Sequence, residues 1–373
     1  MIYLDNAATT SLSKAALQTF MDISTEYYGN SSSIHWAGRK ANAILRQARA
    51  DIAHILDGKP EQIIFTSGGS EADTLAIQGY ALANQHKGKH LITTAIEHHA
   101  VLHTMDYLHE RFGFEVTYIQ PINQRISAQQ IQAALRPDTI LVSAMYANNE
   151  TGLLLPIKEI GEILSQHQAV FHVDAVQAIG KVAISPEQLG IDFLSAAAHK
   201  FHGPKGVGFL YSRIPHFDSL IHGGRQEQQH RAGTENLAGI AAMATALKEQ
   251  TAQLKEHYTR VSALKGYLIS NLTSIHHYLN ETGPTLPYVV NLGFPNQLNE
   301  QVLMRLDLAG IAVSSGSACT AGVIQNSHVL ESLYGKESHR LKESIRISFS
   351  HENTKEELDF LIKQLHEIIG GTY

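Results

Sequence analysis

The sequence predicts an α/β protein with a mostly parallel sheet, followed by a smaller α+β unit. Short strand-like apolar runs alternate with helical patterns as far as Tyr211, and the alternation changes character after that residue. Strands that alternate with helices form parallel sheets covered on both faces. The chain has 373 residues, which is enough for two or three domains at roughly 100–200 residues each.

The first part of the chain supplies the elements of this sheet. From Arg39 to Asp57, apolar residues recur at three- and four-residue steps, which predicts an amphipathic helix that ends before Gly58. Helical patterns also cover Ser127–Leu135 and Ile157–His167. Seven strand-like runs accompany them: Gln62–Thr66, Leu91–Thr94, Glu115–Ile119, Ile140–Met145, Val170–Val173, Phe193–Ala196 and Val207–Tyr211. We therefore expect a seven-stranded sheet in a large unit.

The pattern after Tyr211 predicts the smaller unit. A loop rich in Gly, His and Gln, His222–Gly233, leads into a long helical stretch from about Leu237 to Thr273. The elements expected beyond it are a strand at Tyr288–Leu292, a helix at Glu300–Leu308, a strand at Ile345–Phe349 and a helix at Glu356–Ile369. We expect a large unit over 13–255 and a small unit formed by 1–12 and 256–373, joined by the long helix.

Composition and charge exclude several classes of protein. The net charge of −6 argues against nucleic acid as the main partner, because phosphate binding needs a basic face. No apolar run reaches the roughly 18 residues of a membrane span, and the first residues, with Asp5, do not resemble a secretory signal. The single cysteine, Cys319, excludes an intrachain disulfide or a multi-cysteine metal site, so no metal is expected, and the cytoplasm is the expected compartment.

A lysine and an aspartate stand at the ends of two predicted strands. Lys200 follows Phe193–Ala196 and precedes a Gly203-Pro204 turn. A buried lysine of low pKa can form a Schiff base with an aldehyde cofactor, whereas a surface lysine has no such role.

Asp174 directly follows the strand Val170–Val173, and strand ends face the ligand crevice in such a sheet. A carboxylate there either pairs with a cation, such as the ring nitrogen of pyridoxal phosphate, or holds a backbone donor.

Two small-residue segments add a candidate anion site and a candidate nucleophile. The turn 66–71, Thr-Ser-Gly-Gly-Ser-Glu, joins a strand to a helix, and helix N-termini bind phosphate, although many tight turns look alike. Cys319 lies among serines and glycines in 314–322, which predicts an exposed, mobile loop carrying a reactive thiol. His98, Asn149 and Arg346 also lie at or near strands, so one crevice can gather these groups.

With these residues in view, the chain resembles a cysteine desulfurase of the NifS/IscS-like group, class V of the fold-type I pyridoxal phosphate (PLP) enzymes. The resemblance covers essentially the whole chain. The motifs that carry it are Tyr3-Leu-Asp-Asn-Ala-Ala-Thr-Thr10, Phe65-Thr-Ser-Gly68, Glu97-His98, Asn148-Asn-Glu150, His172-Val-Asp174, His199-Lys200, Arg231-Ala-Gly-Thr-Glu-Asn236 and Ser314-Ser-Gly-Ser-Ala-Cys-Thr320.

The resemblance implies roles around the cofactor ring. Lys200 would bind PLP covalently and later move protons. His98 would stack on the pyridine ring and share the acid–base work. Asp174 would pair with the ring N–H, and Gln177 would bond the phenolic oxygen.

The resemblance also implies a phosphate site shared between two subunits. Gly69, Ser70 and His199 would hold the phosphate, with Thr234 supplied by the neighbouring subunit of a homodimer.

The resemblance implies a substrate and a sulfur carrier as well. Asn149 and Arg346 would hold the carboxylate of L-cysteine. Cys319 would attack the substrate sulfur, release L-alanine and keep a persulfide for an acceptor such as an iron–sulfur scaffold or a tRNA-thiolation enzyme.

Two other functions stay open at this point, together with some departures from the family pattern. A selenocysteine lyase or another β-elimination enzyme would use the same residues, and a non-catalytic sulfur-trafficking scaffold would keep the fold. The departures are Ala197 at a usual Ser, Ser11 and Ser31 at usual prolines, Arg225 at a usual Gly and Gln228 at a usual Arg. Ala197 removes one hydroxyl expected at the phosphate.

Overall fold

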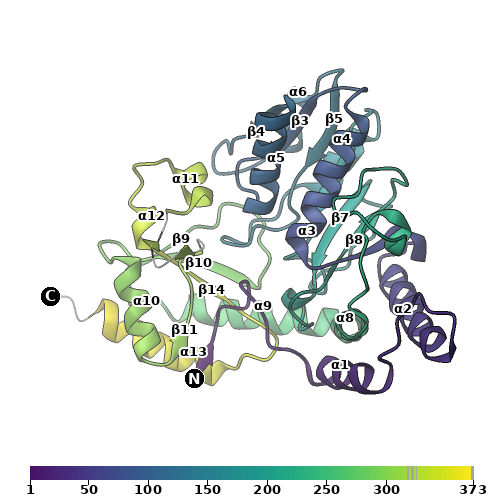
Figure 1. The fold of residues 1–373 in the computed structure, drawn as a ribbon. Helices are drawn as coiled ribbons and strands as arrows, with labels where there is room; N and C mark the ends of the chain where they lie inside the picture. The colour runs from purple at the N-terminus through teal and green to yellow at the C-terminus, as the bar shows by residue number, and fades with distance from the viewer. Residues whose placement is uncertain (317–318, 321–322, 325, 371–373) are drawn as a thin grey trace.

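The computed structural model describes residues 1–316, 319–320, 323–324 and 326–370, with side chains for 1–316 and 326–370. A seven-stranded sheet forms the centre of the larger unit (Figure 1). Its order is β2 (Ile63–Thr66), β8 (Gly208–Ser212), β7 (Phe193–Ala197), β6 (Val170–Asp174), β5 (Thr139–Ser143), β3 (His90–Thr94) and β4 (Glu115–Ile119). Only β8 runs antiparallel to its neighbours. The predicted mostly parallel α/β sheet is therefore confirmed.

Helices cover both faces of this sheet, because every central strand buries side chains on both sides. One apolar cluster joins the sheet to α5 (His99–Phe112) and to a continuous helical run made of α3 (Gly69–Thr74), the π-helical η2 (Leu75–Gly79) and α4 (Tyr80–Asn84). The opposite face packs against α2 (Trp36–Ile55), α6 (Ala128–Ala134), α7 (Ile157–Leu164) and α8 (Leu237–Ala252). Helix α1 (Lys14–Glu26) lies against α8. A strand such as β5 is thus buried throughout.

The smaller unit contains a three-stranded antiparallel sheet and three main helices (Figure 1). The sheet order is β14 (Ser344–Ser348), β10 (Val289–Gly293) and β9 (Tyr278–Leu279), and the helices are α9 (Leu254–Ser270), α10 (Asn299–Leu308) and α13 (Lys355–Ile369). The shorter elements are β1 (Ile2–Tyr3), β11 (Ile311–Ala312), β12 (Cys319–Thr320), β13 (Val323–Ile324), α11 (His328–Tyr334) and α12 (Arg340–Glu343).

The N-terminal segment joins this unit although it starts the chain. Strand β1 pairs with β11 in parallel, and the next residue, Leu4, is fully buried in the apolar cluster of the small unit. Three 3₁₀ turns complete the described elements: η1 (Pro60–Gln62), η3 (Ala198–Lys200) and η4 (Gln226–Gln229). This packing supports the division into 13–255 and 1–12 with 256–373, which stays a prediction.

The prediction of one long helix from about Leu237 to Thr273 is wrong. The structure breaks it at Gln253, whose φ of −115° and ψ of 17° are not helical, so α8 and α9 are separate helices. The Gln253 Oε1 accepts a hydrogen bond from His257 Nε2 at 2.9 Å. The break lets α8 follow the large sheet and α9 follow the small unit, and neither Gly nor Pro marks it in the sequence. Among the described helices, none is long and apolar enough to cross a membrane.

Candidate active site

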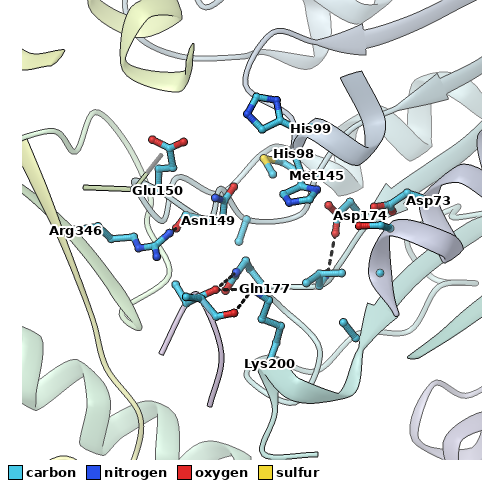
Figure 2. A pocket seen from close by; sticks show the side chains of 18 of the residues that line it. Asp73, His98, His99, Met145, Asn149, Glu150, Asp174, Gln177, Lys200 and Arg346 are labelled. Atoms are coloured by element: carbon cyan, nitrogen blue, oxygen red, sulfur yellow. Dashed lines mark hydrogen bonds between the residues drawn. The ribbon is translucent and has the colours of Figure 1, made fainter. Parts of the chain in front are cut away.

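A cavity of about 440 Å³ opens beside the carboxyl ends of β5, β6 and β7 and reaches strand β14 of the small unit (Figure 2). Nine of the predicted site residues line it: Gly69, Ser70, His98, Asn149, Asp174, Gln177, His199, Lys200 and Arg346. Apart from Arg346, which lies on β14 of the small unit, they come from segments at or after strand ends that meet at one edge of the large sheet. In the part of the chain that the structure describes, no group of three or more His, Cys or acidic side chains is arranged to hold a metal ion.

Lys200 projects into this cavity from the η3 turn that follows β7. Its Nζ donates to Ala7 O at 2.6 Å and to Ala8 O at 2.8 Å, so the N-terminal segment holds the amine in place. Burial, and then the charge of Arg346, lowers the pKa of Lys200 to about 8. A substantial neutral fraction near pH 8 makes this amine a candidate nucleophile.

Two buried carboxyl groups lie together on the sheet side of the cavity (Figure 2). Asp174 ends β6, and its Oδ1 accepts from Val176 N at 2.9 Å. Asp73, on α3, lies 3.4 Å from the ring nitrogen Nε2 of the buried His172. Burial raises the pKa of each carboxyl to about 7, and the charge of Asp73 adds to the rise at Asp174. Asp174 has no ion-pair partner among the described residues, so a cation in the cavity would stabilise its charged form.

His98 caps α5 and faces the cavity. Its Nδ1 accepts from Ala100 N at 3.1 Å, and because a backbone N–H only donates, the proton of the neutral ring lies on Nε2. Burial, followed by the charge of Lys200, lowers the pKa of His98 to about 4. His98 is therefore a neutral ring with one N–H donor at physiological pH. The preceding residue, Glu97, is fully buried, and burial raises its pKa to about 8.

The start of α3 forms a narrow wall of the cavity. A Cβ added to Gly69 would lie 2.7 Å from Val176 Cγ2 and 3.6 Å from Ala197 Cβ, so a larger residue would not fit there. Ala197 also lines the cavity. His199 follows it, and its Nδ1 lies 3.2 Å from Thr9 Oγ1. Free N–H groups at a helix start suit an anion.

Arg346, on β14, brings a guanidinium from the small unit. Its Nη2 donates to Asp5 Oδ1 at 2.7 Å and its Nη1 donates to Asn149 O at 3.0 Å. The buried Nε has no hydrogen-bond acceptor in the described part of the chain. A guanidinium that lines the cavity beside Asn149 is suited to a carboxylate.

Gln177 lies one turn beyond Asp174 and contacts the N-terminal segment. Its Nε2 donates to Ala7 O at 2.9 Å, the same carbonyl that accepts from Lys200. Its Oε1 accepts from Lys181 Nζ at 3.2 Å.

Two predicted site residues are not brought into this cavity within one chain. Thr234 is exposed and does not line it. The backbone of Cys319 lies in β12, which pairs with β13, but its side chain lies outside the described residues, as does much of the loop predicted to be mobile. Further cavity residues had no role in the sequence analysis: Ala7, Ala8, Asp73, Met145, Glu150 and His328. Ala7, Ala8 and Glu150 stand in motifs quoted above without an assigned role. Nothing in the local sequence marks Asp73, Met145 or His328, because only the fold brings them to this edge.

Comparison with known proteins agrees with this arrangement. The aminotransferase class-V family model matches residues 2–361. A Bacillus subtilis (strain 168) protein named IscS 1 is 46% identical over 99% of this chain and 98% of its own, and a Methanosarcina thermophila protein named cysteine desulfurase IscS is 43% identical over 99% and 92%. A solved NifS-like protein superposes with a TM-score of 0.92 at 35% identity and covers 99% of both chains. This chain belongs to the aminotransferase class-V family.

Proposed function

We propose that this protein is a PLP-dependent cysteine desulfurase, which converts L-cysteine to L-alanine and holds the removed sulfur on Cys319. The relatives named cysteine desulfurase, which match almost the full length of the chain, support this activity. The observation that carries the proposal is the meeting of Lys200, Asp174 and Arg346 in one cavity. These groups are an amine of low pKa, a buried acid without a cation and a cation for a carboxylate.

The residues of the cavity fit PLP. Asp174 is a buried acid that a protonated ring nitrogen would keep ionised. Gly69 and Ser70 line the cavity at the start of α3, where backbone N–H groups suit a phosphate, and His199 lines the same cavity. Bound PLP supplies an electron sink that weakens the carbon–sulfur bond of cysteine.

The side chains of this protein would orient the substrate and move its protons. Arg346 and Asn149 would bind the cysteine carboxylate, since both line the cavity and Arg346 supplies a positive charge. Lys200, with a pKa near 8, can accept and return a proton at physiological pH. His98, neutral with its proton on Nε2, can donate a hydrogen bond to a substrate or cofactor atom.

Cys319 would receive the sulfur by direct attack on the substrate. Its thiolate forms a bond to the substrate sulfur as the carbon–sulfur bond breaks. The electron pair of the broken bond stays with the carbon, which takes up a proton to give alanine. The protein sulfur and the transferred sulfur remain as a persulfide, so the step needs no external oxidant.

We also propose that the working protein is a homodimer that passes its sulfur to an acceptor protein. The exposure of Thr234 supports a role for it in the cavity of a second copy rather than in its own. The acceptor is a protein with a thiol or an iron–sulfur scaffold, reached through the loop that carries Cys319.

The test is chemical mapping of the cofactor. Borohydride reduction of PLP-loaded protein, followed by peptide analysis, should place the cofactor on Lys200. A Lys200→Ala variant should retain no reducible PLP. Labelling of Lys181 or Lys205 in place of Lys200 would reject the assignment.

A further inference from the structure

Lys181 is a buried amine that the proposed chemistry does not use. Only 7% of its surface is exposed, and it does not line the cavity. It lies four residues beyond Gln177, in the turn that follows β6. Buried lysines are rare unless something pairs with them.

No carboxylate neutralises this amine in the part of the chain that the structure describes. Its Nζ donates to Gln177 Oε1 at 3.2 Å and lies 5.4 Å from the ring centre of Tyr288. Burial, followed by the charges of Lys200 and Arg346, lowers the pKa of Lys181 to about 7. The fold therefore keeps a costly group at this place, and among the described residues its one hydrogen-bond partner is the amide of Gln177.

The contacts of Gln177 fix which end of its amide faces which neighbour. Ala7 O can only accept, and it lies 2.9 Å from Nε2. Lys181, when charged, can only donate, and it lies 3.2 Å from Oε1. A flipped amide would place two oxygens together at Ala7 and two sets of N–H groups together at Lys181. Both neighbours therefore favour the same orientation.

This orientation decides what Gln177 offers to the cavity. Nε2 has two hydrogens, and Ala7 O accepts one of them. The second N–H is left for a group inside the cavity that Gln177 lines. An N–H at this position favours an oxygen with negative charge, whereas an amide oxygen would repel it.

We propose that Lys181 is a positioning residue, which holds the Gln177 amide so that its free N–H meets the phenolic oxygen of the bound cofactor. The inference rests on the proposed function, because that function supplies the ligand. Loss of one hydrogen bond that orients the amide should raise the PLP dissociation constant by about 3- to 10-fold. The absorbance of the bound cofactor should also change its pH dependence, because the phenolic oxygen loses an oriented donor.

The experiment is a double-mutant cycle on the purified, PLP-loaded protein. The variants are Lys181→Met, Gln177→Ala and both together. Each protein is measured for PLP dissociation, for the pH titration of its visible absorbance and for thermal stability. Lys265→Met is the control, because Lys265 is also a buried lysine but pairs with Glu281 and bonds Thr285 and Val289 in the small unit, away from the cavity.

The inference predicts that Lys181→Met weakens PLP binding in the wild-type background and adds nothing in the Gln177→Ala background. Equal weakening in both backgrounds, or the same spectral change in Lys265→Met, would overturn it. If Lys181→Met does not fold, Lys181→Arg answers the question, because a donor at this place should keep the wild-type titration. A titration in Lys181→Arg like that of Gln177→Ala would also overturn the inference.

The two proposals fail in different ways. If wild-type protein and every variant fail to bind PLP, the proposed function is wrong and the inference falls with it. If wild-type protein binds PLP on Lys200 and the cycle is additive, the function stands and Lys181 has only a packing role.

Discussion

Burial drives the ionisable side chains of this cavity toward their neutral forms. It raises the pKa of Asp174 to about 7 and lowers that of Lys200 to about 8 and that of His98 to about 4. Charged groups lose water contacts in the cavity without gaining full partners. A ligand with a cationic ring nitrogen would restore the charge on Asp174. Pairing with this unpaired carboxyl would therefore contribute to the binding free energy of the ligand.

The free-energy cost of burying a charged Asp174 predicts the stability of the Asp174→Asn variant. Asn keeps the shape and the acceptor for Val176 N, but it carries no charge. The pKa of Asp174 rises from 3.8 to about 7 on folding, which corresponds to at most about 4 kcal/mol. The folded protein holds this proton more tightly, so the penalty is absent below about pH 4 and complete above about pH 7. The cofactor-free variant should therefore be more stable than wild type at pH 8.

Thermal unfolding of both cofactor-free proteins from pH 4 to pH 8 measures this effect. The advantage of Asp174→Asn should grow with pH, while its PLP affinity should fall by about 10- to 100-fold, since one charge-assisted bond is lost. Lower stability at pH 8 would show that Asp174 is satisfied without a ligand.

Ala197→Ser tests the single residue that departs from the family pattern inside the cavity. Ala197 Cβ lies close to the position a Gly69 side chain would take, so a hydroxyl there would reach the same wall. We expect Ala197→Ser to retain PLP up to about tenfold more tightly, from one charge-assisted hydrogen bond less its rotamer cost. The PLP dissociation constants of the two proteins check this. Unchanged binding would mean that Ala197 does not face the phosphate.

At the scale of elements, a buried ion pair helps to hold the loop that carries Thr234, beside the Arg231–Glu71 pair of the same loop. Glu227, in a left-handed conformation with φ of 44°, accepts from Arg49 Nη1 and Nη2 at 2.7 and 2.6 Å and from Phe65 N at 2.8 Å. This contact ties η4 to α2 and to β2. The loop geometry therefore depends on a residue distant in sequence.

Arg49→Met should lower the free energy of unfolding of the protein. The variant leaves the Glu227 carboxylate buried without its cation, which typically costs about 3–5 kcal/mol. Urea unfolding measures this decrease. Glu115→Gln is the control, since its partner Arg136 is exposed and such surface pairs contribute about 0–1 kcal/mol. If the free energy of unfolding falls no more in Arg49→Met than in the control, the Arg49–Glu227 ion pair does not stabilise the protein.

Most elements could be predicted from the sequence, and those that could not share a physical reason. Strands such as β4 and helices such as α13 follow their apolar pattern, because burial on a sheet or along a helix face dictates the period. The break at Gln253 has no local signal, since tertiary packing of α8 and α9 imposes it. The same holds in the site: Lys200 and Asp174 stand in recognisable motifs, whereas Asp73 and Lys181 gain a role only once the fold has placed them.

At the scale of the whole molecule, the cavity is assembled from both units. Arg346 comes from β14 of the small unit, while Asp174 and Lys200 come from the large unit. Ala7 of the N-terminal segment contacts both units, because its N–H donates to Ser348 Oγ and its carbonyl accepts from Lys200. A second copy completes the site in our proposal, through Thr234.

Hybrid dimers test that completion. A dimer of one Lys200→Ala protomer and one Thr234→Ala protomer has a single cavity with an intact lysine. If Thr234 acts across the dimer, that cavity receives a wild-type Thr234 from the other protomer, so its PLP affinity should equal that of wild type. Affinity as weak as in the Thr234→Ala homodimer would place Thr234 in its own subunit's site.

The most direct test of the central claim is the fate of the substrate sulfur. PLP-loaded wild-type protein and Cys319→Ser are given L-cysteine, and alanine release and the mass of the peptide containing residue 319 are measured together. We predict that wild type forms alanine and gains one sulfur atom on Cys319, while Cys319→Ser binds PLP normally and forms almost no alanine. Because the chain has no second cysteine, alanine formation at the wild-type rate in Cys319→Ser would contradict the account.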